Sequence, residues 1–170
     1  MADGREESAG ERRVLVAGIG NVFRSDDGFG CEVVRRLAAQ TWADGVRIVD
    51  YGIRGLHLAY DLLEPWDAVV LVDALPDRGA VGSVVVVEVG RDDIGTGAQV
   101  DAHGMDPATV LASLAALGGS LPPRVLVVGC QVGDTGEGMG LTPGVAAAVD
   151  EAVRTVRRLV THDVRAAEVA

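Results

Sequence analysis

Three residues of the chain have the types and positions from which a divalent-metal site can be built. Asp27 follows the first buried apolar run, Asp73 ends another apolar run, and His103 lies in a polar loop just before a helical segment. Two carboxylates and an imidazole, without a thiolate, suit zinc, iron, nickel or manganese with open coordination positions. Each residue also has a structural interpretation: Asp27 as a helix cap, Asp73 as a turn cap and His103 as a solvated loop residue. The chemical interpretation requires that the fold bring the three together.

Short β-branched runs alternate along the chain with amphipathic stretches. This alternation predicts five strands with three or four helices packed around them. The expected strands are residues 13–18, 46–50, 68–72, 81–89 and 124–128, and the expected helices are residues 27–39, 56–63, 106–117 and 143–159. The last helix has the best start signal, Thr142 as N-cap with Pro143 at the first helical position, and Asp106 with Pro107 resembles it.

The predicted fold class is α/β, a single domain with a mostly parallel sheet between helices. Strands that are apolar on both faces are typical of parallel sheets covered on both sides. The Pro-Asp-Arg-Gly turn at residues 76–79 favours one hairpin between the third and fourth strands. Ligands of such sheets bind beyond the carboxyl ends of the strands. Asp27, Asp73 and His103 all follow strands at that edge, so convergence of the three is expected.

Composition limits the classes of protein to which the chain can belong. Its 170 residues suit one domain, and we expect a disordered tail at residues 1–12, the folded domain at 13–160 and a second tail at 161–170. No apolar run approaches the roughly 20 residues of a membrane helix, and the polar start is no signal peptide. A cytoplasmic protein without a membrane partner is therefore expected.

Charge and cysteine content exclude further classes of site. The formal net charge is −10, which argues against a nucleic-acid partner. The chain has no lysine, which excludes Schiff-base and Ser–Lys mechanisms. Its two cysteines, Cys31 and Cys130, form no CxxC motif and fall in helix and strand patterns, so they are expected to be packing residues.

The loop at residues 18–30 begins like a dinucleotide-binding turn, with Gly18-Ile19-Gly20. Such a turn needs a third glycine where this chain has Phe23, and here the helix opens at two acids, Asp26 and Asp27. Acids at a helix N-terminus are compatible with the helix dipole but do not help to bind pyrophosphate. A nucleotide-binding module is therefore the weaker alternative.

Seven spaced blocks together resemble the nickel–iron hydrogenase maturation endopeptidases, over nearly the whole chain except its tails. The blocks are residues 18–21 (Gly-Ile-Gly-Asn), 25–30 (Ser-Asp-Asp-Gly-Phe-Gly), 50–55 (Asp-Tyr-Gly-Ile-Arg-Gly), 71–74 (Leu-Val-Asp-Ala), 103–104 (His-Gly), 128–130 (Val-Gly-Cys) and 140–143 (Gly-Leu-Thr-Pro). Their order is more specific than any one block alone.

The resemblance implies a twisted five-stranded sheet between helices and the removal of a C-terminal peptide from a nickel-loaded hydrogenase large-subunit precursor. The metal-contacting and catalytic residues of the family match Asp27, Asp73 and His103. Asn21 and Arg54 are expected to bind the substrate, although Arg54 stands where many relatives carry a small hydroxyl residue. The nickel is expected to come with the substrate, while zinc or another divalent metal suits the free protein. The protein is expected to act as a monomer.

Several functional alternatives stay open at this point. Water can be activated by the metal, or by Asp27 acting as a general base. A nickel-dependent chaperone that grips the precursor without cutting it would use the same residues. A peptidase of the same fold that acts on unrelated proteins is a further alternative.

Overall fold

The computed structural model describes residues 11–90 and 106–163 of the chain. His103 lies outside the described residues, as do most of the two predicted tails. None of the helices in the described part has both the length and the apolar content needed to cross a bilayer.

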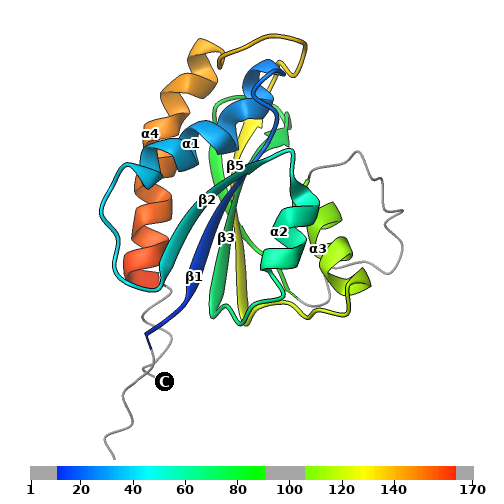
Figure 1. Ribbon diagram of the computed structural model, residues 1–170. Coiled ribbons are helices and arrows are strands. Elements are labelled where there is room, and N and C mark those ends of the chain that lie inside the picture. Colours follow the sequence, from blue (N-terminus) through cyan, green and yellow to red (C-terminus); the bar gives the residue numbers. More distant parts are fainter. Residues whose placement is uncertain (1–10, 91–105, 164–170) are drawn as a thin grey trace, which may run out of the picture.

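The centre of the fold is a five-stranded sheet in the order β2-β1-β3-β5-β4 (Figure 1). Strands β2, β1, β3 and β5 run parallel, and β4 pairs antiparallel with β5 at the edge. The bounds are β1 Val14–Ile19, β2 Val46–Gly52, β3 Ala68–Pro76, β4 Val84–Glu88 and β5 Arg124–Val132. The predicted mostly parallel α/β domain is confirmed.

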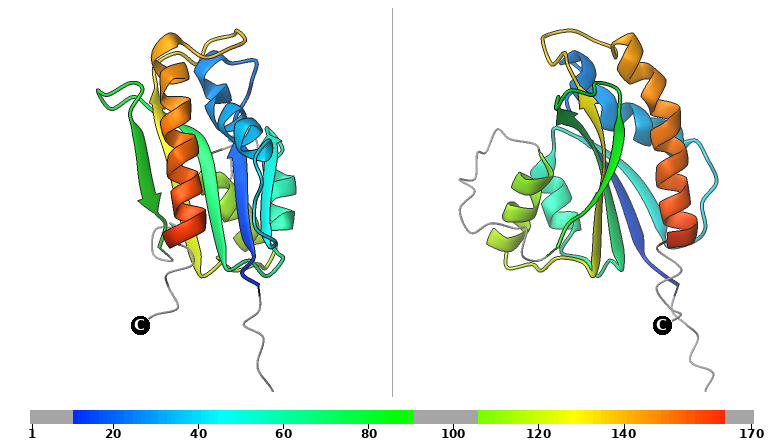
Figure 2. Two further views of the ribbon diagram at one scale, coloured as in Figure 1. Left: turned by 90° about the vertical axis from the view of Figure 1, so that its left-hand side faces the viewer. Right: turned by 180° about the vertical axis from the view of Figure 1, so that it is seen from behind.

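Helices cover both faces of the sheet, so the domain has three layers (Figure 2). Helices α1 and α4 pack on one face, and α2 and α3 on the other. A short 3-10 turn, Ser25–Gly28, precedes α1, and a π-helical turn, Leu159–Asp163, follows α4. The helix bounds are α1 Phe29–Ala38, α2 Gly55–Asp61, α3 Pro107–Ala116 and α4 Pro143–Arg158.

The predicted hairpin between the third and fourth strands is wrong. Strand β4 does not pair with β3: it pairs with β5, where Val86 lies opposite Val128. Strand β5 takes the place beside β3 because residues 125–130 are buried, which suits a central strand. Strand β4 leaves Val86, Val87 and Glu88 exposed, which suits an edge. The turn at residues 76–79 therefore begins a longer connection that passes over the end of β5.

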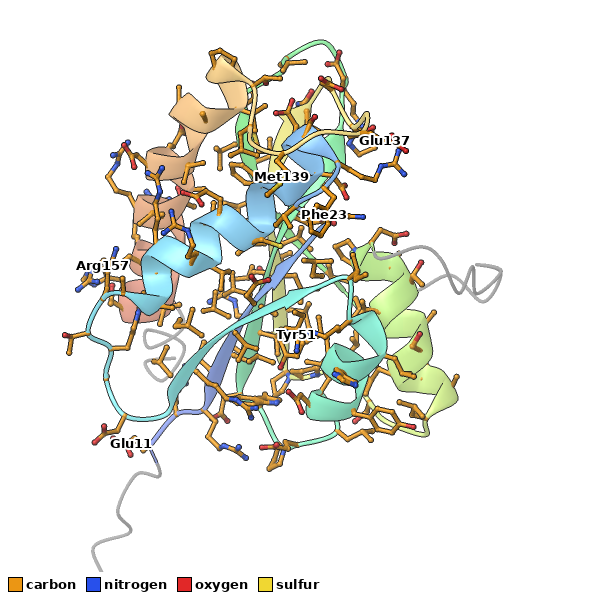
Figure 3. All side chains as sticks on the ribbon, turned by 45° about the horizontal axis from the view of Figure 1, so that its top comes forward. Glu11, Phe23, Tyr51, Glu137, Met139 and Arg157 are labelled. Carbon is orange, nitrogen blue, oxygen red and sulfur yellow. The ribbon has the colours of Figure 1, made fainter. Side chains whose placement is uncertain are left out.

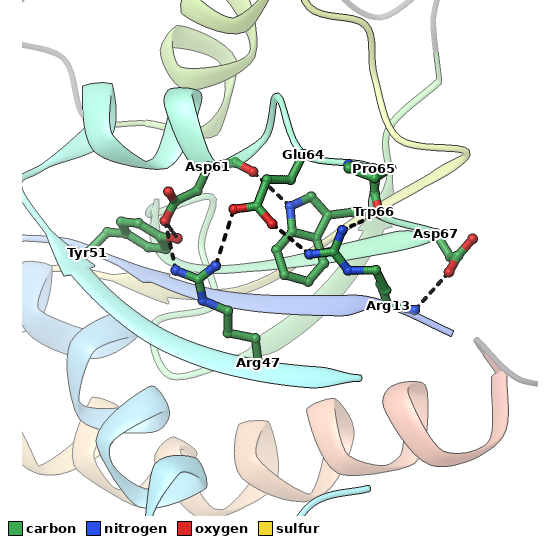
Figure 4. Close-up of polar contacts among 8 residues, drawn as sticks. All are labelled: Arg13, Arg47, Tyr51, Asp61, Glu64, Pro65, Trp66 and Asp67. Carbon is green, nitrogen blue, oxygen red and sulfur yellow. Dashed lines mark hydrogen bonds and ion pairs between the residues drawn. The ribbon is translucent and has the colours of Figure 1, made fainter. Parts of the chain in front are cut away.

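Side chains at the amino ends of the strands fasten α2 to the sheet (Figure 4). The buried ring of Trp66 lies beneath two guanidinium groups, 4.7 Å from Arg13 and 5.9 Å from Arg47. Arg13 pairs with Glu64 at 2.6 Å, but exposed ion pairs contribute little, so the packed indole supplies most of the stabilisation. This network therefore serves stability at the end of the sheet away from the predicted site.

The first turn of α1 lies directly on the ends of two strands. A Cβ atom added at Gly30 would lie 2.2 Å from the carbonyl oxygen of Val72 and 2.3 Å from that of Ile19. Both contacts are with backbone atoms of the sheet, so neither can move aside cheaply. Glycine at position 30 therefore lets α1 begin against β1 and β3.

We predict that Gly30→Ala lowers the free energy of unfolding by about 3 kcal/mol, the upper end of ordinary overpacking costs. The matched control is Gly144→Ala in the first turn of α4, where an added Cβ would meet nothing within 4 Å. That change should shift stability by about 1 kcal/mol or less, and upward, because alanine favours a helix. Urea unfolding of both variants checks the prediction, and equal midpoints would contradict it.

Candidate functional site

A cavity of about 820 Å³ opens at the carboxyl ends of β1, β3 and β5. Asp27, Asp73 and Asn21, three of the residues predicted from the sequence, line it. Its other walls include the start of α3, the last residue of β5, Val132, and two residues that follow it, Gly133 and Thr135. The cavity thus lies at the strand edge where ligands of α/β sheets bind.

The turn after β1 holds Asp27 in place through a second close backbone approach. Gly20 has φ +142°, and a Cβ there would lie 2.0 Å from the carbonyl oxygen of Asp27. The backbone N–H of Asn21 donates to Asp27 Oδ2 at 3.0 Å, and Asn21 Oδ1 accepts from the N–H of Phe23. Asp27 does not cap α1, whose N-cap is Gly28 without a side-chain hydrogen bond. The carboxylate is therefore oriented by the turn and not by the helix.

The neighbouring Asp26 has a structural role that the sequence does not reveal. It is fully buried, and it accepts hydrogen bonds from the backbone N–H of Thr142 at 2.7 Å and from the Thr142 hydroxyl at 2.9 Å. The N–H of Asp26 donates to the carbonyl of Asp134, and that of Ser25 to the carbonyl of Gly138. These bonds fix the loop after β5 against the loop after β1, so two walls of the cavity are tied together.

Asp73 is the most buried acid of the cavity, with 5% of its surface exposed. Burial raises the pKa of Asp73 well above its usual range. A hydrogen bond from the N–H of Ala74 to Oδ1, at 2.8 Å, opposes that shift. The charges of Asp27 and Asp106 raise the pKa further. The carboxyl groups of this cavity therefore disfavour each other's charge.

Three further charged residues line the cavity: Asp77, Asp106 and Arg24. Asp106 is the N-cap of α3 as expected, accepting from the N–H of Thr109 at 3.0 Å, and it also lines the cavity. Arg24 is the only cation among the described lining residues, and its Nε donates to the carbonyl of Thr135 at 2.9 Å. The Asp-Pro motif predicted that Asp106 caps α3, but it did not predict that Asp106 lines the cavity.

Arg54, predicted to bind substrate, does not line this cavity. Its guanidinium group turns back and donates to the carbonyls of Asp50, at 2.5 Å, and Tyr51, at 3.1 Å. It borders a shallower hollow of about 260 Å³ next to Phe23 and Ile53. Arg54 thus stabilises the turn between β2 and α2, and its contact with substrate stays a prediction.

The donor set of the cavity fits a divalent cation. Asp27 and Asp73 supply carboxylate oxygens, which divalent metals accept, and a cation would offset the repulsion between them. Across residues 11–90 and 106–163, no three His, Cys, Asp or Glu side chains are grouped closely enough to hold a metal ion. His103, the third predicted ligand, lies outside the described residues.

The two cysteines have no features of a nucleophile. Both are buried free thiols, and burial raises the pKa of Cys31 to about 12 and that of Cys130 to about 11. Because the thiolate is the reactive form, neither is activated at neutral pH. Their predicted role in packing agrees with this environment.

Comparison with known proteins gives one consistent result. The family model described as hydrogenase maturation protease matches residues 31–159. The chain is 36% identical to the hydrogenase expression/formation protein HupD of Rhodobacter capsulatus, over 85% of this chain and 71% of the relative. It is 31% identical to a putative hydrogenase maturation protease of Methanocaldococcus jannaschii, over 86% of this chain and 95% of the relative.

Solved structures agree. The hydrogenase maturating endopeptidase HybD of Escherichia coli superposes with a TM-score of 0.70 at 25% identity, covering 87% of this chain and 92% of that one. A hydrogenase 2 maturation peptidase from a Thaumarchaeota archaeon gives 0.68 at 29% identity, covering 88% and 99%.

The buried charge of Asp73 generates a prediction for the metal-free protein. Its folded-state pKa lies above the ordinary value of 3.8, so the folded state holds the proton more tightly than the unfolded state. The resulting penalty is absent below about pH 3.8, grows as pH rises toward the folded pKa, and is complete above it. Asp73→Asn should therefore be more stable than the wild type at pH 8, and the difference should vanish below about pH 3.5.

Thermal unfolding across this pH range, in the presence of a chelator, measures the difference. Asp67→Asn, at the opposite end of the sheet, is the control for the loss of one carboxylate outside the cavity. An Asp73→Asn variant that is no more stable than the wild type at pH 8 would contradict the assigned burial of that charge.

Proposed function

The chain belongs to the hydrogenase maturation protease family, and we propose that it removes the C-terminal peptide of a nickel-loaded hydrogenase large-subunit precursor by using Asp27, Asp73 and His103 to contact the nickel. The observation that carries this proposal is the shared cavity of Asp27 and Asp73, in which the charge of one opposes the charge of the other. Two HupD-type relatives and the E. coli structure are named for hydrogenase formation or maturation, which supports the substrate class.

Electrostatics explains how such a site would distinguish nickel-loaded from nickel-free precursor. In the free protein the buried carboxyl of Asp73 resists ionisation, and the nearby Asp27 increases that resistance. A divalent cation brought by the substrate stabilises both ionised carboxylates in a site with little water to screen them. A precursor without nickel brings no such compensation. Its scissile bond is then not held in place, and positioning contributes several kcal/mol to catalysis.

The cleavage is a hydrolysis. A water oxygen attacks the scissile carbonyl carbon, the C–N bond breaks, and a proton passes from the water to the leaving amine. In this proposal Asp27 accepts the proton of the water, and the hydrogen bond from the N–H of Asn21 to its Oδ2 supports that role by orienting the carboxylate. The substrate's nickel is an alternative activator of the same water. Loss of the pH dependence of the rate in Asp27→Asn would assign the base to Asp27.

The remaining predicted residues take supporting roles in this proposal. His103 supplies the third metal contact, and zinc or another divalent metal in the free protein would use the same three residues. Asn21 orients Asp27 and lines the path of the substrate. Arg24, fixed by the carbonyl of Thr135, is the cation available to a carbonyl or carboxylate of the bound chain.

The other functional readings have less support. The matching family is one of proteases, which favours cleavage of the precursor over binding without cleavage. The non-cleaving chaperone is therefore the weaker hypothesis. A nucleotide site at the turn after β1 would bring phosphates beside Asp27 and Asp73, whose charges oppose it.

We predict that Asp27→Asn and Asp73→Asn each lower the rate of precursor cleavage by at least about 100-fold, since each removes a metal contact or a proton acceptor. The assay incubates purified protein with cognate precursor, nickel-loaded or nickel-free, and follows the precursor mass. Wild-type protein should truncate only the nickel-loaded form, and the control Asp67→Asn should behave like the wild type.

Two results would contradict the proposal. Equal cleavage of nickel-free precursor would remove nickel recognition from it. Full activity of folded Asp27→Asn and Asp73→Asn variants would remove these carboxylates from the site.

A further inference from the structure

A second, apolar hollow of about 600 Å³ lies between α3 and the outer strands β4 and β5. We call it the α3–β4 groove. Alternate residues of β4 and the segment after it face it, together with one side of α3 and two residues of β5, Val127 and Gln131. These apolar lining residues are Val85, Val87, Val89, Leu111, Ala112 and Val127.

The groove continues directly from the cavity that holds Asp27 and Asp73. Leu75, Pro76 and Asp106 line both hollows, so the end of β3 and the start of α3 form their common wall. A chain that passes through the cavity can therefore run on into the groove without leaving the protein surface. This continuity distinguishes the groove from an isolated apolar patch.

The opposite side of the cavity has a different shape. Ile53 borders the cavity and, with Phe23, a neighbouring shallow hollow, and both side chains are largely exposed, at 61% and 65%. Figure 3 shows Phe23 at the same end of the molecule as Met139, which is 76% exposed. Projecting apolar side chains suit the surface of a folded partner, whereas a concave groove suits a narrow extended chain.

We propose that the α3–β4 groove binds the peptide that the enzyme removes, through apolar side chains of that peptide. This inference rests on the proposed function, because an endopeptidase must hold its substrate on both sides of the bond that it cuts. The removed peptide ends in a free carboxylate. Two charged residues, Arg78 and Asp106, are among the described residues that line the groove, and Arg78 is the one that can pair with that carboxylate. The apolar lining with one guanidinium group therefore suits a short apolar peptide that ends in a carboxylate.

Adjacent residues of β4 provide a matched pair of variants. Val87 faces the groove and is 50% exposed, while Val86 points to the other face of the sheet and is 42% exposed. Val87→Asp should lower kcat/KM for nickel-loaded precursor by about tenfold, mainly through KM, because it weakens binding away from the reacting bond. Val86→Asp should stay within about twofold of the wild type.

A second substrate shows whether the groove binds the C-terminal extension of the precursor. In this precursor, serine replaces the apolar residues of the C-terminal extension. Wild-type protein should cut it about tenfold less efficiently, and Val87→Asp should cause no further loss, because both changes remove the same contact. Arg78→Gln should weaken cleavage of the original precursor as well.

Each contrary result has a distinct meaning. A wild-type protein that does not cut the original precursor overturns the proposed function and the role of the groove with it. A wild-type protein that cuts, with Val87→Asp equal to Val86→Asp, overturns the groove alone. If Val87→Asp lowers cleavage of both substrates by the same factor, the groove serves another occupant, such as residues 91–105 of this chain, and the proposal is wrong.

Discussion

The site depends on the absence of side chains between the start of α1 and the strand ends. A Cβ at Gly30 would collide with the carbonyl of Val72, the residue just before Asp73, and a Cβ at Gly20 would collide with the carbonyl of Asp27. The two glycines thus let the segment carrying Asp27 settle against the strand carrying Asp73. Buried Asp26 then ties the loop after β5 to the same turn through Thr142. The cavity thus depends on two features: the close backbone packing at Gly20 and Gly30, and the hydrogen bonds of the buried Asp26 carboxylate.

Stability and chemistry are placed at opposite ends of the sheet. The amino ends carry the packed indole of Trp66 beneath Arg13 and Arg47, whose charges lie at the surface. The carboxyl ends carry acids that oppose one another, with Asp73 nearly out of contact with water. Because the ionised forms of these carboxyl groups repel one another, a bound cation would stabilise them. The apolar groove beside it and the projecting Phe23 provide the surface that a protein substrate requires.

Much of the fold could be predicted from the sequence because its signals are local. Apolar runs marked the strands, and Thr142-Pro143 and Asp106-Pro107 marked helix starts that the structure confirms. The partner of β4 could not be predicted, since a turn sequence does not say which strand lies beside it, and burial of β5 decided the order. Because Asp27 and Asp73 each follow a predicted strand, their position in the sequence was enough to predict that they share one cavity. The role of Asp26 needs Thr142, 116 residues away, and the choice of Arg24 over Arg54 at the cavity depends on loop geometry.

Recognition of nickel by Asp27 and Asp73 is best tested by the binding of precursor before turnover. Stopped-flow mixing separates association from cleavage, so affinities for nickel-loaded and nickel-free precursor can be compared in the wild type and in a doubly substituted Asp27→Asn, Asp73→Asn protein. We expect the wild type to prefer the nickel-loaded form by at least about tenfold and the double variant to lose the preference, since the carboxylates that the cation stabilises are gone. The same preference in both proteins would show that nickel is recognised elsewhere and would contradict the account.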